Sequence, residues 1–127
     1  MLRLIQQCGL PIAGPCVRTI RCLPGMFGQL NRKGKVVVSD GTNPLGIIED
    51  IRTDTATTIR GKRICMWTSP GVYATDQVEK RCNFLVGRLL YVSNRGKLTT
   101  RQRSKKHRSV GMVISYRAGV LEFQFWG

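Results

Sequence analysis

Groups that could carry out catalysis are scarce in this sequence. Its 127 residues contain one histidine, His107, and seven acidic residues. Glu49 and Asp50 are adjacent, but neighbouring residues of a strand point to opposite faces and do not form a catalytic pair. A cysteine nucleophile needs a histidine and a group that orients it, and only His107 could serve. There is also no glycine-rich phosphate loop followed by a helix. We therefore expect no catalytic residue and no cofactor, and we predict that the protein is not an enzyme.

Paired cysteine motifs are missing too. The five cysteines are Cys8, Cys16, Cys22, Cys65 and Cys82, and no two of them form a C-x-x-C pair. The spacing of common zinc sites is therefore absent, and we expect no metal. Two interpretations of the thiols stay open. Either all of them are reduced, as is usual in a cytosolic protein, or Cys8, Cys16 and Cys22 form disulfides between subunits.

Long hydrophobic runs do not occur. No segment is apolar over the roughly 20 residues of a transmembrane helix. The first residues, MLRLIQQCGLPIAGPC, are interrupted by Gln6 and Gln7 and are not typical of a signal peptide. We expect synthesis in a cytoplasm and no membrane partner.

A sustained helical period is also absent, and turn residues dominate instead. Gly, Pro, Asn and Asp recur about every ten residues between short β-branched or aromatic runs. This spacing predicts an all-β fold, either a small β-barrel or a β-sandwich. The expected strands are Cys16–Leu23, Lys35–Ser39, Leu45–Ile51, Thr57–Arg60, Arg63–Thr68, Gly71–Thr75, Arg88–Ser93, Lys97–Thr100, Ser109–Tyr116 and Val120–Trp126.

The last two expected strands have the clearest pattern. Arg117-Ala118-Gly119 is a short connection with a glycine available for positive φ. In the final strand Leu121, Phe123 and Phe125 share one face, and Glu122, Gln124 and Trp126 share the other. This alternation predicts one buried face and one hydrated face.

The first 23 residues differ from the rest, because they contain three of the cysteines and no acid. We predict two parts: an extended N-terminal arm over residues 1–23, which could bridge to a neighbouring subunit, and a β-barrel or β-sandwich domain over residues 24–127. The alternative for the arm is an ordinary first strand with a loose end in front of it.

Positive charge is the strongest feature of the composition. The 21 Lys and Arg exceed the acids so far that the formal net charge is +14. Such a charge favours a polyanionic partner, namely nucleic acid, an anionic membrane surface or an acidic protein surface.

The cations are densest in a stretch between two expected strands, with no acid among them. They are Arg101, Arg103, Lys105, Lys106 and Arg108. We predict that this basic loop contacts a partner, first an acidic protein neighbour and second DNA; the third interpretation is a solvated loop without a partner. The loop has no aromatic residue, so stacking on bases would need aromatics from elsewhere.

A longer pattern resembles a known class of proteins. It comprises PGMF at 24–27, GKVVVSDG at 34–41, PLGIIED at 44–50, GVYATD at 71–76, VGRLLYVS at 86–93, GKLTT at 96–100 and VGMV at 110–113. Over about residues 24–126 this order resembles small β-rich structural proteins of tailed bacteriophages, of the capsid decoration or cement type.

The resemblance implies a structural virion protein on the capsid exterior, made in the host cytoplasm. It implies that the major capsid protein or other virion subunits are the partners, and that the chain forms a homo-oligomer, for which we expect a trimer. A tail or baseplate component is the nearest alternative. A basic nucleic-acid-binding β-barrel is the alternative from a different class.

Overall fold

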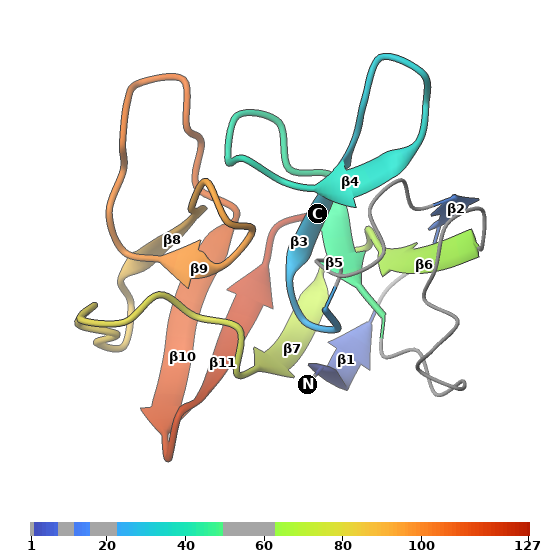
Figure 1. Cartoon of the computed structure of the whole chain (residues 1–127). Helices are drawn as coiled ribbons and strands as arrows, with labels where there is room; N and C mark the ends of the chain where they lie inside the picture. Colours follow the sequence, from blue (N-terminus) through green and yellow to red (C-terminus); the bar gives the residue numbers. More distant parts are fainter. Residues whose placement is uncertain (1, 8–11, 16–22, 50–62) are drawn as a thin grey trace.

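The computed structural model describes residues 2–7, 12–15, 23–49 and 63–127 of the chain, and in this part it contains strands and no helix. The strands form two antiparallel sheets (Figure 1). The all-β prediction is therefore confirmed. Nothing in the described part is a helix of the length and apolarity that crossing a membrane requires.

The larger sheet has the strand order β1-β7-β11-β10-β8-β9. Its strands are β1 (Leu2–Gln7), β7 (Gly71–Thr75), β8 (Leu89–Val92), β9 (Leu98–Thr99), β10 (Gly111–Arg117) and β11 (Val120–Phe125). The smaller sheet has the order β2-β6-β5-β3-β4. Its strands are β2 (Ile12–Pro15), β3 (Phe27–Leu30), β4 (Val36–Val38), β5 (Gly46–Ile48) and β6 (Arg63–Trp67).

The hairpin β10–β11 forms the centre of the larger sheet. Arg117 pairs with Val120, and the two residues between them, Ala118 and Gly119, have φ of 51° and 78°. Positive φ at both central residues is the geometry that matches the twist of a two-residue hairpin. The connection predicted from Arg117-Ala118-Gly119 is therefore a tight turn.

The main core lies between the two sheets. The expected inner face of β11 is confirmed, because Leu121 and Phe123 are fully buried and Phe125 nearly so. Their rings and side chains meet Phe27 of the smaller sheet, whose ring centroid is 5.5 Å from that of Phe125. Tyr73 completes the aromatic cluster and donates its hydroxyl hydrogen to the Ser69 carbonyl over 2.9 Å.

A second apolar cluster lies on the other face of the smaller sheet. Ile47 packs in the main core while Ile48 packs with Met26, Val36 and Met66 in the second cluster. Successive residues of a strand point to opposite faces, so one strand serves both clusters. A run of apolar residues such as Gly46–Ile48 is typical of a strand buried on both faces.

Most predicted strands are present, with bounds shifted by a residue or two. Strands β4 to β11 fall on predicted segments, whereas β3 and the two N-terminal strands were not predicted as strands. The predicted strand Thr57–Arg60 and most of Cys16–Leu23 lie outside the described residues. Within residues 1–23, β1 pairs with β7 and β2 pairs with β6 of the same chain. A bridging role for the arm stays a prediction.

Candidate polyanion-binding surface

The basic loop connects β9 to β10 and projects from one end of the molecule (Figure 1). All five predicted contact residues are exposed: Arg101, Arg103, Lys105, Lys106 and Arg108. A local turn gives the loop its shape, because the Ser104 hydroxyl accepts the Lys106 N–H over 3.2 Å and lies 2.9 Å from Nδ1 of His107. The Gln102 amide donates to the His107 carbonyl over 2.8 Å. The cations are therefore carried by a folded loop.

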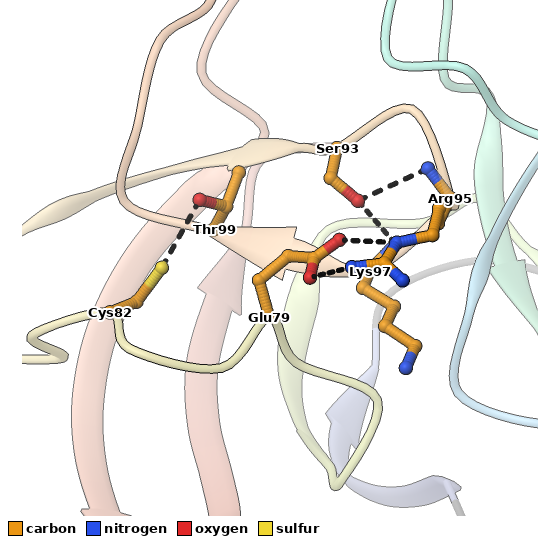
Figure 2. Close-up of polar contacts among 6 residues, drawn as sticks. All are labelled: Glu79, Cys82, Ser93, Arg95, Lys97 and Thr99. Carbon is orange, nitrogen blue, oxygen red and sulfur yellow. Dashed lines mark hydrogen bonds and ion pairs between the residues drawn. The ribbon is translucent and has the colours of Figure 1, made fainter.

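The first residue of the loop is tied to the segment before β8. The Thr99 hydroxyl accepts the Arg101 N–H over 3.1 Å and lies 3.3 Å from Sγ of Cys82. Figure 2 shows the thiol and the hydroxyl pointing toward each other. The Arg101 guanidinium also donates to the Arg81 carbonyl over 3.3 Å. These contacts hold the loop where it leaves the sheet.

The β8–β9 hairpin beneath the loop is held by a polar cluster (Figure 2). Arg95 makes two charge-assisted hydrogen bonds to the Glu79 carboxylate, of 3.3 and 3.0 Å. The Ser93 hydroxyl accepts the backbone N–H groups of Arg95 and Lys97. Burial raises the pKa of Glu79, but hydrogen bonds from Ser93 and Arg95 and the charges of Arg95 and Lys97 lower it more, so the pKa lies below its usual value.

We expect Glu79→Gln to reduce the free energy of unfolding at neutral pH by about 0.5–1 kcal/mol, because Arg95 is largely exposed and such pairs are screened by water. A lowered pKa in the folded state contributes stability above the unfolded pKa, near 4.5, that is lost as the pH falls through the folded value. The difference between wild type and variant should therefore vanish in acid. Denaturant titrations between neutral pH and strong acid measure it. A difference that stays constant across that pH range would contradict the stabilising role of the ionised Glu79 carboxylate.

His107 packs the basic loop against the β4–β5 connection. Gly41 has φ of 91°, and a Cβ built on it would lie 2.9 Å from Cδ2 of His107 and 2.2 Å from the Val92 carbonyl oxygen. The imidazole therefore lies directly over the glycine. The sequence predicted no catalytic role for His107; in the structure this half-buried side chain positions the loop.

A second basic loop projects from the same end of the molecule (Figure 1). It connects β3 to β4 and exposes Arg32, Lys33 and Lys35. The Asn31 side chain shapes it by accepting the backbone N–H groups of Lys33 and Lys35, each over 2.9 Å. We call the eight exposed cations of these two loops the two-loop basic surface. Sequence reasoning missed this half, because the loops are some 70 residues apart in the chain.

The β4–β5 connection carries the acid nearest in sequence to these loops, Asp40. Its carboxylate accepts the hydroxyl hydrogen of Thr42 over 2.5 Å and the backbone N–H of the same residue over 3.0 Å. These hydrogen bonds lower the pKa of Asp40, so it is ionised at neutral pH. One carboxylate, already hydrogen-bonded by Thr42, offsets little of the charge of eight cations.

An exposed tryptophan stands where the basic loop returns to the sheet. Trp126 keeps 44% of its surface exposed, and its indole N–H donates to the Ser109 hydroxyl over 3.2 Å. Ser109 directly follows Arg108. An aromatic plane that the loop itself lacks is thus present beside it.

The predicted thiol contacts are outside what the structure describes. Cys8, Cys16 and Cys22 lie outside the described residues, while Cys82 is a free, half-buried thiol. Among the described residues no three His, Cys, Asp or Glu side chains come together as a metal site would require.

Comparison with protein-family models, with curated proteins and with solved structures finds no match to this chain.

Proposed function

We propose that the protein is a structural component of a tailed-phage virion, a decoration protein that binds the capsid exterior through the two-loop basic surface. The observation that carries the proposal is the placement of two separately anchored cationic loops at one end of a rigid double-sheet core. The sequence pattern over residues 24–126 supplies the class, as a resemblance.

The physical properties of the surface suit this role. Exposed ion pairs are individually weak, at about 0.2–1 kcal/mol. A contact repeated over a shell does not need high affinity at each site, because mass action favours the bound state when the protein is abundant. Complementary charge also sets the encounter rate and orientation between a basic ligand and an acidic lattice. Trimer formation and bridging by the N-terminal arm belong to the same proposal.

The experiment that tests the proposal is the copy number of the chain in purified particles, measured by quantitative mass spectrometry against the major capsid protein. A decoration protein should be present in numbers comparable to the capsid subunits. A few copies per particle would assign it to the tail or baseplate instead, and particles that lack the chain would contradict the virion assignment.

Trp126 favours a second candidate function, which is binding of single-stranded nucleic acid. Cations that follow a phosphate backbone, together with an aromatic plane for a base, are the features of such sites. The exposed indole beside Arg108 supplies the plane. Among the residues that the structure describes, one exposed aromatic is tied to the basic loop, whereas the sites that bind several nucleotides use several stacking residues. We therefore place this function second.

A further inference from the structure

The face of the larger sheet that points away from the main core contains a row of cross-strand partners. The register places four residues in this row, across β8, β10, β11 and β7: Leu89, Met112, Gln124 and Val72. Partners in adjacent strands share a face of the sheet. A chain neighbour of each of the four belongs to the main core, and successive residues of a strand point to opposite faces. The row therefore lies on the outer face.

This outer face is largely apolar. Leu89 is 47% exposed, and Met112 and Val72 are half-buried. Tyr91, two residues along β8, and Val120, four residues before Gln124 in β11, lie on the same face and are also half-buried. Outward positions of packed sheets are normally polar, so an exposed apolar area here is a candidate contact. We call Val72, Leu89, Tyr91, Met112 and Val120 the outer apolar face.

The polar residue of the row, Gln124, is bonded within the chain. Its amide nitrogen donates to the Gly71 carbonyl over 3.2 Å and to the Phe125 carbonyl over 3.0 Å. Buried polar groups in proteins need hydrogen-bond partners, and this amide nitrogen already has them. The row can therefore be covered by an apolar surface without leaving that nitrogen unpaired.

The charges on this face nearly cancel. Register and strand alternation place five charged residues on it, within or directly beside the strands: Arg3, Asp76, Lys97, Arg117 and Glu122. Three bases and two acids leave a formal charge of +1, compared with +14 for the whole chain. None of the five is in the central row, and Lys97 lies near the Glu79 carboxylate. Arg88, directly before β8, follows the opposite alternation.

We propose that the outer apolar face is the contact between two copies of this chain. Acidic proteins, nucleic acid and anionic bilayers are attracted by an excess of cations, and the two-loop basic surface offers that excess elsewhere. A second copy is repelled by most of a surface that carries +14. The nearly neutral outer apolar face is where two copies can approach with the least repulsion. The inference goes beyond the proposed function and does not depend on the virion assignment.

The geometry of a sheet suits a two-fold contact. Two sheets pack face to face at about 10 Å with interdigitating side chains, and a two-fold axis brings the same residues of both copies together. Met112 lies in the middle of the row, where its flexible side chain can adapt to its counterpart. The row is only about 14 Å long across its four strands, so we expect a weak dimer. The trimer expected above would need a head-to-tail contact through other surfaces.

The test is sedimentation equilibrium of the full chain, freed of nucleic acid, in about 0.3 M salt to screen the net charge. Between about 10 μM and 1 mM, the range of a weak contact, the average mass should rise from 14.3 kDa toward twice that value. A mass that stays at the monomer value at every concentration would overturn the proposal, and so would an equilibrium between monomer and trimer.

Charge variants at the centre of the row test whether both copies use the same face. In Met112→Lys, and separately in Met112→Glu, a two-fold contact brings two like charges together. Each variant alone should therefore raise the Kd of the dimer at least about 30-fold. An equimolar mixture of the two variants should associate again, because opposite charges then meet. A mixture that remains monomeric, although both variants unfold cooperatively in denaturant, would contradict the two-fold contact.

Two further comparisons complete the experiment. Leu30→Lys adds the same charge at an exposed leucine of the smaller sheet and should leave the Kd unchanged. If it weakens the dimer as much as Met112→Lys does, net charge controls association and the proposal is wrong. Leu89→Lys and Leu89→Glu are a second pair at a more exposed position of the outer apolar face. They should show the same loss and the same recovery on mixing, which tests the contact even if the Met112 variants fold poorly.

The outcomes separate this inference from the proposed function. Dimers of the purified chain, combined with particles that lack it, would support the contact and reject the virion assignment. A high copy number in particles, combined with a chain that is monomeric at every concentration, would do the reverse.

Discussion

Gly41→Ala should reduce the free energy of unfolding by about 3–5 kcal/mol, because two independent penalties coincide at this position. The φ of 91° is a conformation that side-chain-bearing residues rarely adopt. The new methyl group would also lie 2.2 Å from the Val92 carbonyl oxygen, which belongs to the backbone of β8 and cannot rotate away. Denaturant unfolding followed by intrinsic tryptophan fluorescence measures the loss.

Gly34→Ala is the matched control, because Gly34 also has positive φ, 75°, but a Cβ there would meet nothing within 4 Å. It isolates the backbone strain, which we expect to cost about 1 kcal/mol. The excess loss in Gly41→Ala reports the close approach of the β4–β5 connection to β8 and His107. Equal losses at the two glycines would show that this contact contributes nothing.

The strand-rich character could be predicted because short-range patterns determine it. The alternation in Val120–Trp126 is unambiguous, since Leu121, Phe123 and Phe125 are large and lie on one face. Phe27–Leu30 was missed because Gly28 and Gln29 interrupt its apolar pattern. A Cβ on Gly28 would lie 2.8 Å from Sδ of Met66, so the methionine side chain would have to shift to admit it. A glycine in a strand often marks such a close approach.

The candidate surface could be predicted only in part, because it is assembled by topology. A run of cations between two strands shows directly in the sequence at 101–108. Arg32, Lys33 and Lys35 belong to the two-loop basic surface only because of where β3 and β4 lie relative to β9 and β10. A local sequence pattern does not predict this arrangement. The contact between His107 and Gly41 is of the same kind. Leu85 and Val86 are the opposite case, because apolar residues are expected to be buried and only the structure shows that these two are exposed.

The charge of the basic loop is expected to decide partner binding. Replacing Arg101, Arg103, Lys105, Lys106 and Arg108 by Gln removes five positive charges. At about 0.5 kcal/mol for each exposed pair, the loss is about 2.5 kcal/mol, or about 70-fold in affinity. Stability should change little, because these side chains are exposed, and the Arg101 guanidinium donates its one hydrogen bond given above to the exposed Arg81 backbone carbonyl. The measurements are particle occupancy and binding of a single-stranded oligonucleotide, each over a range of salt concentrations.

The control variant keeps the positive charges and changes the shape of the side chains, because Arg101, Arg103 and Arg108 are all replaced by Lys. This variant should retain most of the affinity for an acidic protein surface. Loss of particle occupancy in the five-fold Gln variant, with retention in the Lys variant, is the result that the decoration role requires. If occupancy is unchanged while oligonucleotide binding falls, and Trp126→Leu lowers that binding further, nucleic acid is the partner. Phosphate binding would then weaken steeply with salt as counterions are released. If neither readout responds, the loop is a solvated surface and the two-loop basic surface has no partner.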